Sequence, residues 1–214
     1  MSSAALTILV TGFEPFGGET VNASWEAVRS LDGWRHGDYA VVARLLPCAY
    51  DASVKALVRS IETLRPQAVL MTGQAARRAA VCVERFARNL DDAAAPDNDG
   101  DLRRALRISR AAPEWLESTA PASTIVRALK AAEIRARVST NAGGFVCNHL
   151  YFGALQYLGG HERPVPAVFV HLPATPEQTP PGASASRLTA ARAADALKAA
   201  AAALIDLSQS SEAA

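Results

Sequence analysis

The 214-residue chain has little of several features that would point to a particular class of protein. Its 22 Lys and Arg nearly balance its 21 Asp and Glu, which gives a formal net charge of +1. Binding to nucleic acid phosphates or to an anionic membrane surface needs an excess of basic residues, so neither partner is expected. No apolar run approaches the ~20 residues that would cross a bilayer. Aromatic residues make up only 6% of the chain, so the positions where they occur are informative.

Cysteine is also scarce, because the chain contains only Cys48, Cys82 and Cys147. An odd and widely spaced set does not form a disulfide framework, and no Cys–Cys or Cys–His spacing suggests a zinc site. The first residues lack the basic segment and the long apolar segment of a secretion signal. We therefore expect a cytoplasmic protein with reduced thiols, in which each cysteine serves either packing or chemistry.

The segments that are present predict an α/β fold. Short apolar runs predict strands at Leu6–Val10, Val41–Leu46, Ala68–Met71, Val81–Phe86, Arg135–Val138 and Ala167–Val170. Helical spacing predicts helices at Ala23–Leu31, Ala52–Leu64, Thr124–Ala132, Cys147–Leu158 and Ser186–Leu207. Continuous apolar strands that alternate with helices indicate a largely parallel sheet buried on both faces. No repeat or long linker interrupts residues 1–207, so we expect one domain followed by a frayed tail at 208–214.

Polar segments rich in glycine or proline follow four of the predicted strands. They are Thr11–Gly18, Thr72–Gln74, Ser139–Asn148 and His171–Pro173. Ligands of parallel α/β sheets bind beyond the carboxyl ends of the strands, so we expect these segments to converge on one site. A further polar segment, Asp91–Arg104, predicts a surface loop.

Cys147 lies in the first turn of a predicted helix, directly after a glycine-rich turn. The helix dipole and the free N–H groups of a first turn lower the pKa of a thiol and favour the nucleophilic thiolate. The same N–H groups could hold a developing oxyanion. The alternative is that Cys147 is a small apolar residue on the buried face of its helix. For Cys48 and Cys82, packing is the better interpretation.

A cysteine nucleophile needs a base, and four histidines compete for that role. His36 and His161 precede predicted strands and therefore belong at the opposite edge of the sheet. His149 lies roughly 200° around the helix axis from Cys147 and cannot face its thiol. His171 is the histidine at a carboxyl strand end, so elimination selects it.

The acid that would orient the base stays open among Glu14, Glu84, Asp91, Asp92, Asp97 and Asp99. Glu84 is conspicuous because a carboxylate in an otherwise apolar strand needs a partner. An ion pair with Arg78 or Arg85, or a solvated face of the strand, would also explain it.

Several motifs occur in one order along nearly the whole chain: Val10–Gly18, Gly73-Gln74, Glu84-Arg85, Asp91-Asp92, Pro96-Asp97-Asn98, Phe145–His149 and His171-Leu172-Pro173. With this set the chain resembles the pyroglutamyl peptidase I family, the pyrrolidone-carboxylate peptidases of cysteine peptidase type C15. The resemblance implies a single-domain, three-layer α/β/α fold with a mixed, largely parallel twisted sheet, similar to phosphorylases and hydrolases. It also implies cytosolic homotetramers.

The activity implied by the resemblance is that of a thiol protease (an omega peptidase) that releases N-terminal pyroglutamate from peptides through a thioester, with no metal or organic cofactor. Carried over by position, Cys147 is the nucleophile, His171 the general base and acid, and Glu84 the orienting carboxylate. The implied substrate-binding residues are Phe13, Phe16, Gln74, Phe145 and Val146. Pyroglutamate is a flat, uncharged lactam, so its pocket should be apolar, and hydrogen bonds to the lactam would reject proline by ~10⁴.

The chain departs from the family pattern at Ala94-Ala95, where a basic and then a branched apolar residue are expected before Pro-Asp-Asn. One alternative is therefore a catalytically weak or silent member that binds pyroglutamyl peptides. Another is a phosphorylase-like enzyme on a similar sheet, which would need a phosphate site. The sequence contains neither a P-loop nor a G-x-G-x-x-G motif to provide one.

Overall fold

The computed structural model describes residues 6–161, 165–178 and 188–212. A seven-stranded sheet lies at its centre, with the strand order β2-β3-β1-β4-β9-β5-β8. These strands are β1 (Leu6–Phe13), β2 (Arg35–His36), β3 (Tyr39–Leu46), β4 (Ala68–Gln74), β5 (Val81–Glu84), β8 (Ala136–Ser139) and β9 (Ala167–Leu172). Neighbouring strands are parallel except in the pairs β2–β3 and β5–β9. The predicted fold class, a mixed and largely parallel sheet, is confirmed.

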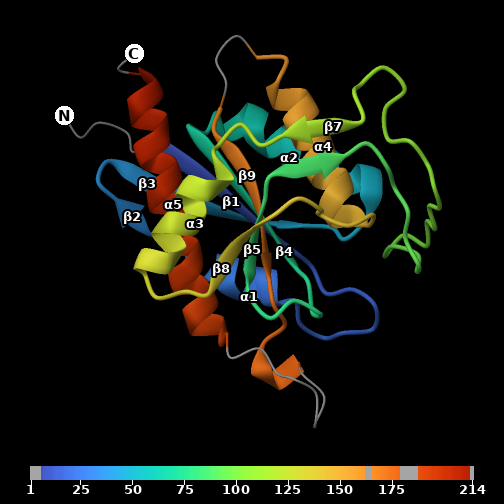
Figure 1. The fold of residues 1–214 in the computed structure, drawn as a ribbon, viewed down its shortest axis with the longest axis horizontal. Helices are drawn as coiled ribbons and strands as arrows, with labels where there is room; N and C mark the ends of the chain where they lie inside the picture. The colour runs from blue at the N-terminus through green and yellow to red at the C-terminus, as the bar shows by residue number, and fades with distance from the viewer. Residues whose placement is uncertain (1–5, 162–164, 179–187, 213–214) are drawn as a thin grey trace.

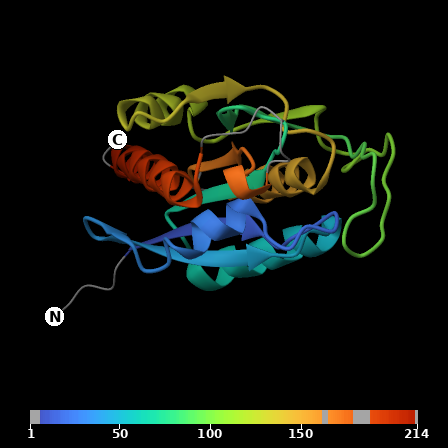
Figure 2. The same cartoon turned by 90° about the horizontal axis from the view of Figure 1, so that it is seen from below.

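Helices cover both faces of this sheet (Figure 1; Figure 2). They are α1 (Ala23–Arg29), α2 (Tyr50–Leu64), α3 (Ala122–Ala131), α4 (Val146–Leu158) and α5 (Ala190–Glu212). The helices α1, α3 and α5 pack on one face, and α2 and α4 pack together on the other. In the part of the chain that the structure describes, no helix is both long enough and apolar enough to cross a membrane.

The core is divided between the two faces of the sheet because alternate residues of a strand point in opposite directions. In β1, Ile8 and Val10 contact the α1, α3 and α5 side, whereas Leu9 contacts the α2 and α4 side. All three residues are fully buried. A strand that is covered on both faces needs apolar residues at every position, which is why continuous apolar runs predicted these strands.

The predicted strand Val81–Phe86 is two strands in the structure. β5 ends at Glu84, and β6 (Phe86–Arg88) pairs with β7 (Trp115–Glu117) in a separate two-stranded sheet. The change occurs at Arg85, whose N–H donates to the Ser139 carbonyl while its own carbonyl accepts from Ser118 N. Both β5 and β6 contain buried apolar residues, so the apolar run in the sequence continues from one strand to the next and does not indicate that they belong to different sheets.

The helices agree with their predicted positions to within a few residues, except at the C-terminus. The predicted start of the last helix at Ser186 lies outside the described residues. Its predicted end at Leu207 is too early, because α5 continues to Glu212 and takes in most of the tail expected at 208–214. Ser208 is buried, and its hydroxyl donates to the Ile205 carbonyl within the helix, so its polar group is satisfied there.

The segment Asp91–Arg104 forms no helix or strand beyond an isolated pairing of Asp91 with Leu106, as predicted for a loop. It is less exposed than a surface loop should be, because Asp91 and Asp97 are both buried. Their burial requires partners, and these lie on α2 and α4 beside the site described next.

Candidate active site

A cavity of about 220 Å³ opens at the carboxyl ends of the central strands. It is lined by Phe13, Phe16, Asn22, Cys48, Gln74, Ala142, Gly143, Phe145, Cys147 and His171. The four strand exits singled out in the sequence all contribute to this lining. The parallel strands β1, β4 and β9 end at the same edge of the sheet, and the loop after β8 reaches it from the far side.

His171 on β9 and Glu84 on β5 form a buried hydrogen-bonded pair. His171 Nδ1 lies 2.8 Å from Glu84 Oε1, and neither side chain is more than slightly exposed. In the antiparallel register Glu84 is opposite Phe169, so His171 is its diagonal neighbour on the same face of the sheet. With Nδ1 directed at the carboxylate, Nε2 is the nitrogen of His171 left for proton transfer at the cavity.

Of the six acids that the sequence left open, only Glu84 contacts His171 among the described residues. The others are occupied elsewhere. Glu14 accepts from Cys48 N, Asp91 contacts His149 and Asp97 accepts from Tyr50 N. Asp92 Oδ1 accepts from Ala105 N, and Asp99 donates its main-chain N–H to Asp97. Periodicity and composition left this choice open, and the contact with His171 agrees with the carboxylate that the family resemblance implies.

Cys147 occupies the first turn of α4, and its sulfur packs directly against β4. A Cβ atom placed on Gly73 would lie 2.7 Å from Cys147 Sγ and 2.9 Å from Phe169 Cζ. Gly73 is also the register partner of His171 in the parallel pair β4–β9. Because Gly73 has no side chain, the Cys147 sulfur can lie against β4. This places the sulfur close to the neighbouring strand β9, which carries His171.

The resting charge state differs from the expectation of a thiol with a lowered pKa. Burial, reinforced by the negative charge of Glu84, raises the pKa of Cys147 to about 12, although Arg78 and the residue's own N–H act in the opposite direction. Burial also lowers the pKa of His171 from its ordinary value of 6.5, against the pull of Glu84. Loss of hydration outweighs the helix-terminus effect, although Cys147 lines the cavity and is only partly buried. Each shift favours the neutral form of its group.

Aromatic rings form one wall of the cavity. The ring centroids of Phe16 and Phe145 are 5.9 Å apart, and Phe145 also meets Tyr50 edge-on at 5.7 Å. Phe13 lines the same space and is almost fully buried. Val146, expected to line the pocket, is instead fully buried in the core between the sheet and α2 and α4. The helical turn directs its side chain away from the cavity that the two flanking residues line.

Gln74, the last residue of β4, contributes a polar side chain to the cavity. Its Oε1 accepts hydrogen bonds from Ala23 N at 2.7 Å and from Gln178 Nε2 at 3.0 Å. No described residue accepts a hydrogen bond from its Nε2. The carbonyl end of this amide is therefore fixed by the protein, and the amino end remains for a ligand.

Cys48 and Asn22 line the cavity without having been assigned to it from the sequence. Cys48 is buried, and its N–H donates to Glu14 Oε1 while its carbonyl accepts from Asn98 N. Burial raises the pKa of Cys48 far above its ordinary range. Its position two residues after β3, at the same edge as the other strand exits, is the signal that could have identified it.

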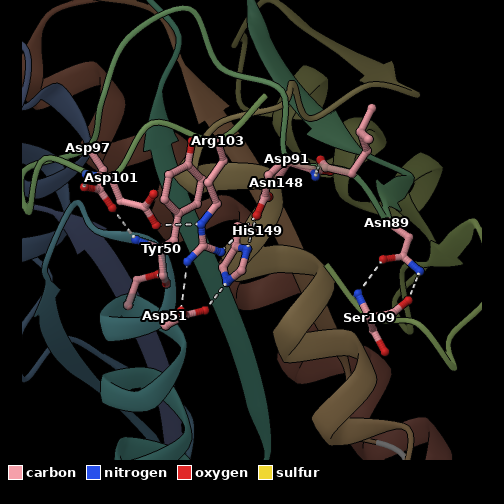
Figure 3. A network of polar contacts seen from close by, with 12 residues as sticks. Tyr50, Asp51, Asn89, Asp91, Asp97, Asp101, Arg103, Ser109, Asn148 and His149 are labelled. Atoms are coloured by element: carbon pink, nitrogen blue, oxygen red, sulfur yellow. Dashed lines mark hydrogen bonds and ion pairs between the residues drawn. The ribbon is translucent and has the colours of Figure 1, made fainter. Parts of the chain in front are cut away.

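A polar network holds the Asp91–Arg104 loop against α2 and α4 (Figure 3). Arg103 contacts Asp51 at 2.8 Å, Asp91 at 3.1 Å and Asp101 at 2.7 Å, and its guanidinium lies 4.4 Å from the Tyr50 ring centre. His149 joins the network through Asp91 at 2.9 Å. As expected, His149 faces away from Cys147, and its role is to fasten the loop to α4.

A phosphorylase-like enzyme would need a phosphate site, for which the Gly17-Gly18 loop and the start of α1 that follows it are the candidate place. The first N–H groups of α1 are already bound, Ala23 N to Gln74 Oε1 and Ser24 N to Asn22 Oδ1. A phosphate needs such groups unpaired. For metals, no group of three His, Cys, Asp or Glu side chains gathers anywhere in the described part of the chain.

Comparison with known proteins gives one consistent result. The family model described as pyroglutamyl peptidase matches residues 6–207. A pyrrolidone-carboxylate peptidase of Cupriavidus taiwanensis is 46% identical over 173 residues, 80% of each protein. Pyroglutamyl peptidase I of Bacillus amyloliquefaciens has a TM-score of 0.90 at 37% identity, covering 94% of this chain and 97% of that one. A mutant pyrrolidone carboxyl peptidase of Pyrococcus furiosus has a TM-score of 0.90 at 31% identity, covering 95% and 100%.

Proposed function

The chain belongs to the pyroglutamyl peptidase family, and from this membership we propose that Cys147, His171 and Glu84 form its catalytic triad. The protein is a cysteine peptidase that releases N-terminal pyroglutamate from peptides. The observation that carries the assignment is the buried His171–Glu84 hydrogen bond at the cavity that Cys147 also lines. A nucleophile, a base and an acid that orients the base are the parts that acyl transfer needs.

Attack on the substrate begins from the neutral pair. Because the pKa of Cys147 is raised and that of His171 is lowered, His171 Nε2 takes the thiol proton as the sulfur bonds to the pyroglutamyl carbonyl carbon. Glu84 holds the Nδ1 proton and stabilises the imidazolium that forms. The N–H groups of Val146 and Cys147, in the first turn of α4, have no preceding helical carbonyl and are available to the oxyanion.

Collapse of the tetrahedral intermediate releases the rest of the peptide. The C–N bond breaks, the leaving amine takes the proton from His171, and pyroglutamate remains bound to Cys147 as a thioester. Water then gives a proton to His171 and attacks the thioester carbonyl. The products are free pyroglutamate and the regenerated thiol.

The cavity suits a small, flat and uncharged acyl group. Its volume of about 220 Å³ and its wall of Phe13, Phe16 and Phe145 favour an apolar ring over a charged N-terminus. The amino end of Gln74 is placed to donate to the lactam carbonyl, since its Oε1 is already bound. Proline lacks that carbonyl and would leave this donor unpaired.

The test is hydrolysis of a fluorogenic pyroglutamyl amide and of its prolyl analogue by the purified protein and a Cys147→Ser variant. The unmodified protein measured in parallel is the control, because neither of the other cysteines lies clear of the site: Cys48 lines the cavity and Cys82 is opposite His171 in register. We expect turnover of the pyroglutamyl compound alone, and its loss in Cys147→Ser. Activity that survives in Cys147→Ser would move the nucleophile elsewhere.

The same proposal extends to organisation and location. We treat residues 1–207 as one catalytic domain, supported by the single seven-stranded sheet that runs through it. A cytoplasmic location is supported by three free cysteines, one of which must stay reduced to act. A homotetramer is the assembly expected from the family. Sedimentation velocity at several concentrations tests it, and a monomer throughout would refute it.

A further inference from the structure

Arg78 lies in the loop between β4 and β5 and directs its guanidinium into the site, with its side chain 19% exposed. Nη1 forms a close ion pair with Glu84 Oε1 and contacts Ser139 Oγ at 3.3 Å. Nη2 donates to the Asn141 carbonyl at 2.7 Å. One side chain thus connects the acid of the triad to the loop that leads from β8 to Cys147.

Arg78 and His171 share a single oxygen of Glu84. Oε1 receives both Arg78 Nη1 and His171 Nδ1, while the buried Oε2 has no partner among the described residues. A buried carboxylate that faced His171 alone would strongly favour the imidazolium form. The guanidinium supplies a compensating positive charge at the same oxygen, so the carboxylate can orient the imidazole without forcing a proton onto it.

We propose that Arg78 is a positioning residue of the reaction, which neutralises Glu84 so that His171 rests as a neutral base and which fixes the loop before Cys147 through Asn141. The proposal rests on the triad proposed above. It assigns to Arg78 a role in the chemistry, whereas an ordinary structural ion pair would contribute only to stability.

Burial is the largest cause of the lowered pKa of His171, and among the charges around it Arg78 is the cation that acts in the same direction against Glu84. β5 presents Glu84 and, directly opposite in register, Cys82. α4 presents Cys147, and β4 presents the side-chain-free Gly73. Arg137, on the neighbouring strand β8, contacts Cys82 Sγ at 3.4 Å. Glu84 is therefore the negative charge in contact with the imidazole, and Arg78 is the cation that shares its oxygen.

The sign of the effect follows from these charges. Arg78 lowers the pKa of His171 and the pKa of Cys147. His171 must be neutral to accept the thiol proton, so activity rises with pH through the pKa of His171. Removal of the guanidinium leaves Glu84 uncompensated, raises that pKa, and moves the acid limb of the pH–rate profile to higher pH.

The experiment compares Arg78→Met and Arg78→Lys with a matched Arg77→Met control. Arg77 is exposed and adjacent, so its replacement changes the net charge equally without touching the site. We expect the acid limb of kcat/KM in Arg78→Met to move upward by about one pH unit or more. Arg78→Lys, which keeps the charge but cannot span Glu84 and Asn141 together, should keep the limb and lose kcat. Arg77→Met should match the unmodified protein.

Titration of His171 by NMR tests the role of Arg78 independently of the assignment of the catalytic triad. The His171 C2 proton, identified by NMR as the resonance that a His171→Asn variant lacks, should titrate at higher pH in Arg78→Met. Equal titration in both proteins, or a fall in kcat with an unmoved acid limb, would overturn the role of Arg78 even where Cys147→Ser is inactive. If the upward shift occurs but Cys147→Ser retains activity, the electrostatic role stands and the triad assignment fails.

Discussion

Replacement of Gly73 by alanine tests the packing of the nucleophile more directly than any change at Cys147. The new Cβ would lie 2.7 Å from Cys147 Sγ and 2.9 Å from Phe169 Cζ, and atoms at such distances must move apart. Phe169 is fully buried, with its ring 4.8 Å from that of His171 and 5.6 Å from that of Tyr151. The ring has little freedom, so the sulfur is expected to move.

The magnitude follows from how much misplacement catalysis tolerates. Overpacking of a buried site costs about 1–3 kcal/mol of folding free energy. A shift of the attacking atom by about 1 Å costs on the order of 10²-fold in rate. We therefore expect Gly73→Ala to fold with a lowered Tm and to lose about 10²-fold in kcat on a pyroglutamyl amide, with a smaller change in KM.

The assay pairs steady-state hydrolysis with thermal unfolding. Gly160→Ala is the control, because the nearest atom to its added Cβ is 3.5 Å away, an ordinary contact. A Cys147→Ala background removes the sulfur, so Gly73→Ala should destabilise that variant less than it destabilises the unmodified protein. Unchanged kcat and Tm in Gly73→Ala, or equal destabilisation in both backgrounds, would refute the close approach of the sulfur to β4.

Three further predictions follow from the same geometry. Glu84→Gln should lose about 10⁴-fold in kcat while remaining folded, because an amide cannot stabilise the imidazolium; near-normal turnover would remove Glu84 from the triad. Iodoacetamide should modify Cys147 slowly near pH 7 and faster as pH rises, because burial raises its pKa to about 12; a rate that is already at a plateau near pH 7 would instead indicate a preformed thiolate. Asp97→Ala should cost about 1–2 kcal/mol in urea unfolding, because its carboxylate caps α2 at Tyr50 N and also holds Asp99 N and Asp101 N; an unchanged unfolding midpoint would contradict the cap.

The central strands and helices were predictable because burial on both sides of a sheet leaves an unambiguous pattern. β1 is buried from Ile8 to Phe13 and β9 along its whole length, and α4 ends at its predicted residue, Leu158. The small β6–β7 sheet was missed because its three-residue strands carry no periodicity of their own. The end of the last helix was placed too early, at Leu207, because the polar residues that follow it gave no helical signal, although Ser208 is buried and bonds within α5.

The cavity was partly predictable for a similar reason. The topological rule brought Phe13, Phe16, Gln74, Cys147 and His171 to one edge from their order along the strands alone. It could not tell that Val146 points into the core or that Cys48 lines the cavity. Side-chain direction in a first helical turn and in a loop depends on the neighbours against which it packs.

The sequence by itself determined the α/β class, the edge of the sheet at which chemistry occurs, the candidate nucleophile and base, and the family resemblance. These depend on local patterns, on residue order and on motifs. Only the tertiary structure showed that Glu84 contacts His171, placed Arg78 on the same carboxylate oxygen, and indicated that burial raises rather than lowers the pKa of Cys147. Each of these depends on distance and on exclusion of water between segments far apart in the chain, and no local pattern records either quantity.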